Sequence, residues 1–358
     1  MRKSDVIILG AGLSGLTTAY ILKDYRKEVL ILEPRNRIGG RVYTLSNPSQ
    51  APVEMGATWV HRPHRYLLSL LEELGIETFD QVMGKEVIYE QNGLSPFQYV
   101  TIPTGEDQSL RVKGGTSKII TGLIQAISSN EIIFAEKANT IINGNEGLHI
   151  KGDKNDYSAD LVISTLPPNL LVNTINFDPF LPRSFIELAK NTHTWMGDSL
   201  KVGLTFEEPF WRKGERKGTI FSNSGPITEM YDHSNFEDNK YSIKGFLDHS
   251  FVDLTKERRK QLVTNQLKKY YGDNMDKMMS YHEYVWQNDP HTYLPNEEIV
   301  SPHQNNGHSQ YQMGHLSNRL ILSGTETSAI FPGYMEGAVY SGLKAAERVK
   351  SFYKKQNV

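Results

Sequence analysis

The sequence contains no cysteine among its 358 residues. A chain without thiols can form no disulfide, no thiolate metal site and no cysteine nucleophile, and we predict no metal site of another kind. Neither sign of charge is in excess, since 39 lysines and arginines are balanced by 41 aspartates and glutamates. Without a basic surplus, neither nucleic acid nor an anionic membrane is predicted as a partner.

Long apolar runs are also missing. No stretch of about 18 apolar residues occurs, so no membrane span is predicted. The short run VIILG at residues 6–10 is too brief for the core of a signal peptide. We therefore expect a cytoplasmic location. The hydrophobic fraction of 38% is typical of a globular protein, and the length suggests roughly two domains.

The first 33 residues have the pattern of a strand, a glycine-rich turn, a helix and a second strand. Residues 5–9 and 28–33 are rich in apolar side chains, which is typical of parallel strands buried on both faces. Residues 16–25 have a helical pattern. Two parallel strands joined by a helix predict an α/β fold.

Three glycines in this turn, Gly10, Gly12 and Gly15, have the GxGxxG spacing. In a dinucleotide site the first permits a tight turn, the second lets a diphosphate approach the backbone, and the third lets helix and strand pack closely. The following helix N-terminus offers N–H groups and partial positive charge to phosphates. Glu33, ending the second strand, is placed to accept from ribose hydroxyls, which disfavours NADP. The motif does not separate NAD from FAD.

The rest of the chain changes character along its length. Residues 159–168 and 319–324 again indicate buried strands, whereas residues 199–206 and 241–247 alternate like half-exposed antiparallel strands. The pair Asn92-Gly93 indicates a hairpin. Further helices are expected at residues 66–74, 118–127 and 255–272 and from about residue 334 to the C-terminal end.

The stretch EPRNRIGGRV at residues 33–42 adds a second anion-binding element. Gly39 and Gly40 allow positive φ and can expose consecutive N–H groups, while Arg35 and Arg41 can meet phosphate oxygens. Together with GAGLSG at residues 10–15, this stretch resembles the start of the flavin-containing amine oxidase superfamily, which includes monoamine, polyamine and L-amino acid oxidases. The resemblance implies FAD, and the lack of cysteine excludes attachment through a cysteine sulfur, so non-covalent FAD is expected.

Three other stretches carry the same resemblance. VEMGATWVH (residues 53–61) is similar to the strand that passes the flavin ring, but Trp59 and His61 occupy the region where L-amino acid oxidases have an arginine, which disfavours an amino-acid substrate. ISTLPP (residues 163–168) resembles the strand that closes the FAD domain. LSGTETSAIFPGYMEGAVYSGLKAAERV (residues 322–349) resembles the second flavin motif, whose helix N-terminus would stabilise negative charge on the reduced ring.

The predicted fold is α/β. A discontinuous Rossmann-type, glutathione-reductase-like FAD-binding domain is expected at residues 1–82, 112–190 and 290–358, and an α+β substrate domain on a mostly antiparallel sheet at residues 83–111 and 191–289. The motifs and the resemblance predict that FAD contacts Gly10, Gly12, Leu13, Ser14, Gly15, Glu33, Pro34, Arg35, Gly39, Gly40, Arg41, Val42, Gly56, Ala57, Thr58, Trp59, Ala138, Thr165, Gly324, Thr325, Glu326, Tyr334, Met335 and Ala338.

Four residues are predicted to act in catalysis. Tyr334 matches the tyrosine that forms one wall of the family's aromatic cage, and Lys201 matches the lysine that holds a water against flavin N5. The second wall is assigned to Tyr293, with Trp286 as the alternative, and His61 is expected to line the site. Ordinary structural roles remain open for each, because a strand lysine is normally solvated and aromatic side chains are normally core.

One part of the family pattern is missing. Between residues 61 and 112 other members insert a helical subdomain that covers the substrate pocket, whereas this interval holds little more than one helix and a hairpin. The site is therefore expected to be open, or covered by another element or subunit. We predict oxidation of the C–N bond of a primary or secondary amine by hydride transfer to flavin N5, with O2 as acceptor and H2O2 as product. FAD-dependent C–C desaturation and a non-catalytic FAD-binding module remain the alternatives.

Overall fold

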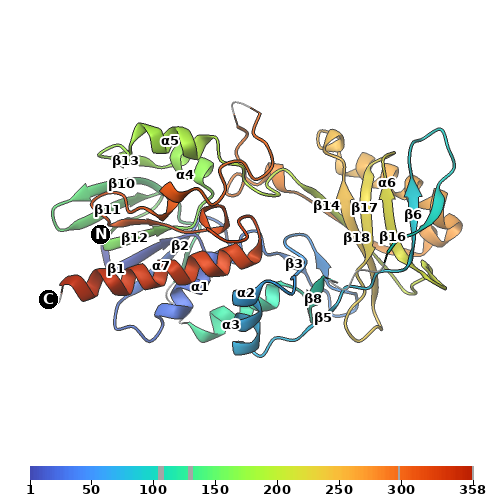
Figure 1. Ribbon diagram of the computed structural model, residues 1–358, viewed down its shortest axis with the longest axis horizontal. Coiled ribbons are helices and arrows are strands. Elements are labelled where there is room, and N and C mark those ends of the chain that lie inside the picture. The colour runs from blue at the N-terminus through green and yellow to red at the C-terminus, as the bar shows by residue number, and fades with distance from the viewer. Residues whose placement is uncertain (104–108, 128–131, 297–298, 357–358) are drawn as a thin grey trace.

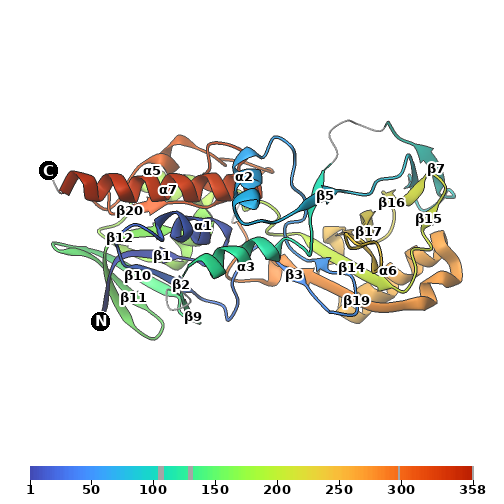
Figure 2. The ribbon, with the colours of Figure 1, turned by 90° about the horizontal axis from the view of Figure 1, so that it is seen from below.

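The computed structural model describes residues 1–103, 109–127, 132–296 and 299–356. Within these ranges two large sheets lie at opposite ends of an elongated molecule (Figure 1). Both chain termini lie at the end that holds the first sheet (Figures 1 and 2). None of the helices in these ranges combines the length and the apolar character that a membrane span requires.

The first sheet has the order β13-β10-β11-β12-β1-β2-β9, with β20 beside β12. The central strand β1 is parallel to both β2 and β12, which confirms the predicted α/β, Rossmann-type class. The strands of this sheet are β1 (Arg2–Leu9), β2 (Val29–Glu33), β9 (Ile132–Phe134), β10 (Ala138–Gly144), β11 (Gly147–Gly152), β12 (Asp156–Ser164), β13 (Asn176–Asp178) and β20 (Leu320–Leu322).

Helices cover both faces of the first sheet (Figure 1). Val6 and Ile8 of β1 face one helical layer, whereas Ile7 and Leu9 face the other. Successive side chains of a strand point to opposite faces, so a strand between two layers has apolar residues at every position. The first layer holds α1 (Leu13–Leu22), α2 (Arg65–Glu73), α3 (Ser117–Ala126) and α7 (Met335–Gln356), and the second holds α4 (Pro168–Thr174) and α5 (Arg183–Lys190).

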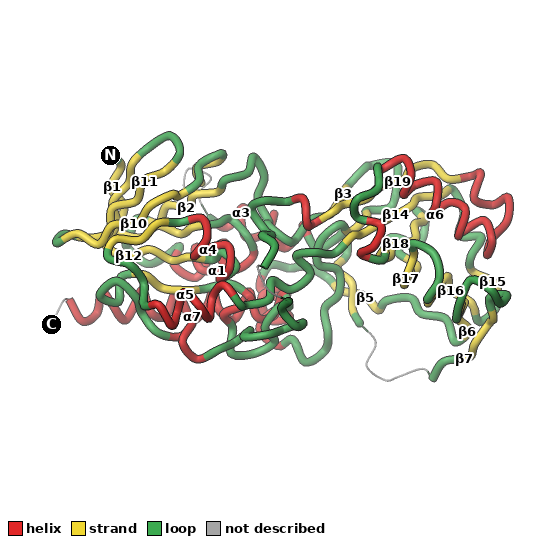
Figure 3. Tube along the Cα trace, turned by 90° about the horizontal axis from the view of Figure 1, so that it is seen from above, coloured by secondary structure: helices red, strands yellow, loops and turns green. Residues whose placement is uncertain are grey.

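The second sheet has the order β19-β14-β18-β17-β16-β6-β7, with β15 beside β16. Its strands pair antiparallel except for β16 with β6. One face is covered by α6 (Lys256–Tyr271), as Figure 3 shows. The strands are β6 (Glu86–Glu90), β7 (Gln98–Thr101), β14 (Leu200–Phe206), β15 (Arg212–Lys213), β16 (Arg216–Ser222), β17 (Ile227–Asp232), β18 (Tyr241–Leu247) and β19 (Met278–Val285).

The prediction of a half-exposed strand is wrong for β14, because all seven of its residues are buried. One face packs under α6. The other face is covered by β4 (Val53–Glu54), and a Cβ at Gly203 would lie 2.1 Å from Cγ1 of Val53. Lys201 of this strand is therefore buried between the two halves of the molecule, with only 4% of its surface exposed.

Shorter elements join the two sheets. The pair of β3 (Thr44–Leu45) with β4 and the pair of β5 (Thr78–Asp80) with β8 (Leu110–Val112) lie between them. The predicted hairpin forms from β6 and β7, but residues 91–97 separate the two strands, so the loop is longer than two residues. Within this loop Asn92 accepts hydrogen bonds from the N–H groups of Leu94 and Ser95. Short 3-10 helices are η2 (His249–Phe251), η3 (Gly272–Lys277), η4 (Trp286–Asn288), η5 (Ser309–Gln312) and η6 (Thr325–Thr327).

The predicted domain segments can be placed on these sheets. The strands of the first sheet fall within residues 1–82, 112–190 and 290–358, and those of the second within residues 83–111 and 191–289. The exact boundaries stay a prediction. Residues 104–108, 128–131, 297–298 and 357–358 of these segments lie outside the described residues.

Candidate active site

A cavity of about 370 Å³ extends from the carboxyl end of β1 to β14 of the second sheet. Its size is within the range of cofactor and ligand sites. It brings together nearly all the residues that the sequence predicts for cofactor binding or catalysis. The exceptions are Gly15, Glu326 and Tyr293, which are not part of the lining.

The glycine turn after β1 has the backbone that the GxGxxG spacing requires. Gly10 has a φ of +104°, and a Cβ at Gly15 would lie 2.1 Å from the Gly10 carbonyl oxygen. Gly15 therefore serves the packing of α1 on the turn. Gly12 differs, because a Cβ there would meet nothing closer than 4.0 Å and would enter the cavity. Its missing side chain leaves room for a ligand.

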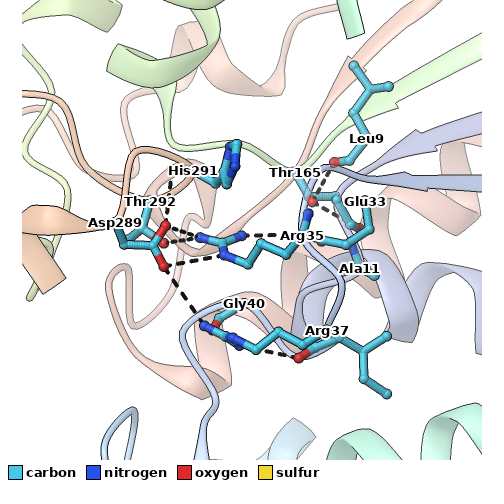
Figure 4. Close-up of polar contacts among 12 residues, drawn as sticks. Leu9, Ala11, Glu33, Arg35, Arg37, Gly40, Thr165, Asp289, His291 and Thr292 are labelled. Atoms are coloured by element: carbon cyan, nitrogen blue, oxygen red, sulfur yellow. Dashed lines mark hydrogen bonds and ion pairs between the residues drawn. The ribbon is translucent and has the colours of Figure 1, made fainter. Parts of the chain in front are cut away.

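Glu33, at the end of β2, is held in place beside this turn (Figure 4). Its carboxylate accepts the N–H of Ala11 at 2.9 Å and that of Arg35 at 3.0 Å, and it is 1% exposed. The Arg35 guanidinium does not point toward solvent, because it donates to Asp289 at 2.6 and 3.3 Å and to Thr292 at 2.7 Å. Arg35 was expected to meet phosphates, whereas here it connects two carboxylates.

The second anion-binding element lies against the first. Gly39 and Gly40 have positive φ, and a Cβ at Gly40 would lie 3.3 Å from Cα of Gly12. Arg41 forms a bidentate pair with Glu326, at 2.5 and 2.7 Å. Glu326 is buried and outside the cavity lining, so its carboxylate orients Arg41, which does line the cavity.

The C-terminal motif packs onto the N-terminal one. The Ser14 hydroxyl is hydrogen-bonded to those of Ser323 and Ser341, and it accepts the N–H of Gly324. These contacts join α1, α7 and the turn after β20. Met335 and Ala338 of the first turn of α7 line the cavity. The two distant ends of the chain therefore form one site.

These residues fit FAD. The cavity has two adjoining glycine turns that leave backbone exposed, an oriented arginine at Arg41, and a carboxylate at Glu33 where a ribose is expected. Thr165 donates to the Leu9 carbonyl oxygen at 2.8 Å, and Thr165 and Ala138 line the same end. Glu136, which the sequence analysis missed, also lines it and is buried. The only sequence signal for Glu136 was that its carboxylate stands two residues before Ala138.

Lys201 lies at the opposite end of the cavity. Its amine donates to the Gly56 carbonyl oxygen at 2.6 Å and lies 5.1 Å from the centre of the Phe246 ring. Burial lowers the pKa of Lys201 to about 8, against the opposing effect of Glu54 and Glu229. A buried amine with a pKa near neutrality can hold a water molecule and exchange a proton with it.

Aromatic rings form the walls near Lys201. The Tyr334 and Trp195 rings lie 6.3 Å apart at 34°, and His303 stacks on Trp195 at 3.9 Å. Tyr293, the predicted second wall, instead packs on Gly197, where a Cβ would lie 2.9 Å from the Tyr293 ring. Trp286 lines the cavity, but its ring is buried and its indole N–H donates to the Met55 carbonyl oxygen at 2.7 Å.

Trp195 is therefore the aromatic residue that the sequence analysis missed. It precedes Lys201 by six residues, in a segment with no regular pattern. Its large aromatic ring was therefore the only sequence feature that could have indicated a place in the site. Position 333 must be glycine for Trp195 to pack there. Its φ is +91°, and a Cβ at this position would lie 2.9 Å from the Trp195 ring. Phe246 was also missed, although it pairs with Lys201 across β14 and β18.

His61 also lines the cavity. Its ring is 6.3 Å from that of Tyr334 and 5.0 Å from that of His64. Burial lowers the pKa of His61, and burial together with His61 lowers the pKa of His64 to about 4. Both rings are therefore neutral at pH 7. The structure places His61 in the cavity lining, and a catalytic role for it stays a prediction.

Comparison with known proteins agrees with this site. The family model described as "Flavin containing amine oxidoreductase" matches residues 13–111 and 97–350. A probable flavin-containing monoamine oxidase A of Dictyostelium discoideum is 24% identical, with 97% of each chain covered, and human amine oxidase B is 24% identical over 97% of this chain and 86% of its own length. The first alignment spans 451 positions, more than the length of this chain, so the relative carries insertions.

Solved structures share the fold. Putrescine oxidase bound to putrescine superposes with a TM-score of 0.83 and 22% identity, covering 98% of this chain and 99% of the other. Cyclohexylamine oxidase from Brevibacterium oxydans has the same TM-score and coverage at 19% identity. The chain belongs to the flavin-containing amine oxidoreductase family and is an FAD-dependent oxidoreductase of the amine oxidase type.

Proposed function

We propose that this protein oxidises the C–N bond of a primary or secondary amine. The observation that carries the proposal is the buried Lys201 amine beside Gly56, at the end of the cavity that Tyr334 and Trp195 also line. Bound FAD would supply the oxidising chemistry: it would accept a hydride from the amine α-carbon at N5 and would pass the electrons to O2, with an imine and H2O2 as the products. The imine is then hydrolysed to a carbonyl compound and an amine or ammonia.

The residues of the chain position the substrate and favour its neutral form. Hydride leaves a neutral amine, and the aromatic lining favours the neutral form because desolvation disfavours an ammonium. Tyr334 and Trp195 line the cavity and limit the orientations that the amine can take there, which is the geometric part of catalysis. Lys201 holds a water molecule at this end and can exchange a proton with it.

The relatives support an amine substrate without identifying it. The names of the structural neighbours refer to putrescine and to cyclohexylamine, a diamine and a monoamine. The test is to purify the protein with FAD and add butylamine, cyclohexylamine or 1,4-diaminobutane without oxygen. Bleaching of the flavin absorbance, followed by H2O2 release in air, supports the proposal. A protein whose flavin is reduced by dithionite but by none of these amines contradicts it.

A further inference from the structure

A second lysine lies buried beside Lys201. Lys244 is on β18, the neighbour of β14 in the second sheet, and none of its surface is exposed. It pairs with Gly203, which follows Lys201 by two residues on β14. Residues directly opposite in antiparallel strands point to the same face, and so do alternate residues of one strand. Lys244 and Lys201 therefore project from one face of the sheet, the face that is turned toward the cavity.

The amines of the two lysines reach the same short segment of chain. Lys244 donates to the Thr58 hydroxyl at 2.9 Å, and Thr58 in turn donates to the Gly56 carbonyl oxygen at 3.3 Å. Lys201 donates to this same carbonyl oxygen at 2.6 Å. The two lysines are therefore connected through one hydroxyl group and one carbonyl group.

These contacts hold the peptide group between Gly56 and Ala57 from both sides. Its carbonyl oxygen accepts from Lys201 and Thr58, and its N–H donates to the Arg41 carbonyl oxygen at 2.9 Å. Residues 56–58 line the cavity, in the stretch that is expected beside the flavin ring. Because the donor and the acceptor of this peptide group are both satisfied, its orientation is fixed, and the Lys201 amine has an acceptor in a fixed position.

Lys244 has no ion pair that would account for its burial. Among the residues that the structure describes, no carboxylate forms a salt bridge with it, and Thr58 is its hydrogen-bond partner. Its amine lies 4.1 Å from the centre of the Phe246 ring and 4.4 Å from that of the Trp59 ring. Burying an amine costs free energy that an apolar side chain would not cost. The amine must therefore be kept for its contact with Thr58.

The surroundings of Lys244 disfavour its protonated form. The charged groups that act on its amine come from four other strands, and they are Lys201 of β14, Glu54 of β4, Glu229 of β17 and Arg111 of β8. Burial and then Lys201 lower the pKa of Lys244 well below its ordinary value, against the opposing effect of the two glutamates. Lys244 is therefore suited to act through its hydrogen bond to Thr58 rather than as a positive charge.

We propose that Lys244 is a positioning residue for Lys201 and that it acts through Thr58 and the Gly56 carbonyl group. The inference rests on the proposed amine oxidation, in which Lys201 holds a water molecule and exchanges a proton with it. Without the Lys244 amine, the Thr58 hydroxyl can turn away from Gly56, and the peptide group loses one of the donors that fix it. The Lys201 amine is then held less precisely, and a misplacement of about 1 Å can cost up to about 100-fold in rate.

The test removes Lys244 with and without Lys201 present. Of butylamine, cyclohexylamine and 1,4-diaminobutane, the amine that reduces the flavin of the FAD-loaded protein fastest is used, without oxygen, and the limiting rate of reduction is measured. Lys244→Met is expected to lower this rate about tenfold in the wild type, but less than about twofold in a Lys201→Met background. The matched control Lys213→Met removes an exposed lysine of the same sheet and should change the rate less than about twofold. Equal losses in both backgrounds, or no loss in the wild type, overturn the inference, because a residue that only supports the fold costs the same with or without Lys201.

Thr58 supplies a second pair of variants. Thr58→Val keeps the shape of the side chain and removes the hydroxyl, whereas Thr58→Ser keeps the hydroxyl. Thr58→Val is expected to slow flavin reduction about as much as Lys244→Met does, and the two changes together should cost no more than either alone. Thr58→Ser should lose clearly less than Thr58→Val. Equal losses in Thr58→Ser and Thr58→Val, or additive losses in the double variant, overturn the inference.

A measurement without substrate separates this inference from the proposed oxidation. If no amine reduces the flavin, the oxidation fails, and the position of the Lys201 amine is then followed by NMR of the protein with lysine labelled with 13C at Cε. The Lys201 resonance is identified by its loss in Lys201→Met. We expect this resonance to shift in Lys244→Met and in Thr58→Val and to stay in place in Lys213→Met. An unchanged Lys201 resonance in Lys244→Met and Thr58→Val overturns the positioning role as well.

Discussion

Arg35 and Asp289 form a two-point ion pair between the end of β2 and the segment in which the chain leaves the second sheet. The Arg35 guanidinium donates to the two Asp289 oxygens at 2.6 and 3.3 Å, and its third nitrogen reaches Glu33 at 3.3 Å. Tyr284 of β19 also donates to Asp289, at 2.9 Å. The proposed ribose carboxylate is thus connected through one arginine to the sheet that carries Lys201.

Asp289→Asn is expected to weaken both the fold and FAD binding. Removing one partner of a buried ion pair costs about 3 to 5 kcal/mol, because the remaining charge stays desolvated, and Asp289 is 7% exposed. We expect a lower free energy of unfolding and at least a tenfold rise in the FAD dissociation constant, measured by urea denaturation and flavin fluorescence. Asp289→Glu should restore part of both. Unchanged FAD affinity in a destabilised Asp289→Asn protein would show that the pair serves the fold alone.

Two alanine substitutions separate the roles of the glycines in the first turn. In Gly15→Ala the new Cβ would lie 2.1 Å from the Gly10 carbonyl oxygen, so the backbone must shift, and overpacking of this kind costs about 1 to 3 kcal/mol. In Gly12→Ala the new Cβ would meet nothing closer than the Gly40 Cα at 4.0 Å, and Gly12 has an ordinary φ of −79°. It should leave the stability of the FAD-free protein within about 0.5 kcal/mol and weaken FAD binding at least tenfold. Equal FAD affinity of Gly12→Ala and wild type would contradict the placement of the diphosphate.

These glycines also show why the cofactor end could be predicted from the sequence. Their roles depend on backbone geometry within a few residues, and the spacing GxGxxG encodes that geometry directly. The same holds for Gly39 and Gly40, whose positive φ follows from the local turn. Apolar runs predicted the four parallel strands β1, β2, β12 and β20 of the first sheet for a similar reason, because burial on both faces leaves a continuous pattern.

The substrate end depends on contacts between distant segments, which no local pattern contains. The alternation in β14 predicted exposure on one side, but Val53 of a remote strand covers that side at Gly203. Trp195 takes a wall position because Gly333, which follows it by well over a hundred residues, leaves room for its ring. The role of Asp289 likewise follows from its contact with Arg35, a residue far away in the sequence.

The aromatic walls can be tested by truncation. Trp195→Ala and Tyr334→Ala should each lower kcat/KM for an amine substrate by about 10- to 100-fold, because the rings restrict the orientation of the substrate and exclude water. Tyr293→Ala should cost less than either, since its ring packs on Gly197 outside the cavity lining. The flavin spectrum of each variant confirms that the cofactor is retained. A larger loss in Tyr293→Ala than in Trp195→Ala would return Tyr293 to the second wall.

Lys201→Met should slow amine-dependent flavin reduction while FAD stays bound. Replacing the amine by a thioether removes the group that holds water and moves a proton, and a loss of about 100-fold in the rate of reduction is expected from general acid–base catalysis. Lys201→Arg should not restore the rate, because a guanidinium does not release its proton near neutral pH. Stopped-flow reduction without oxygen measures this step alone. Full turnover in Lys201→Met would instead favour C–C desaturation.

The same variant tests the pKa of Lys201 through stability. The unfolded lysine has a pKa near 10.5 and the folded one about 8, so between these values the unfolded state binds more protons. The free energy of unfolding therefore rises as the pH increases from 8 to 10.5, by about 3 kcal/mol at 1.36 kcal/mol per pKa unit, and this contribution is absent below pH 8. In urea denaturation, wild type should gain about this much over Lys201→Met between pH 7.5 and pH 10.5. The exposed-site control Lys350→Met should show no such difference from wild type, and a wild-type curve parallel to that of Lys201→Met would mean that the Lys201 pKa is not lowered by burial.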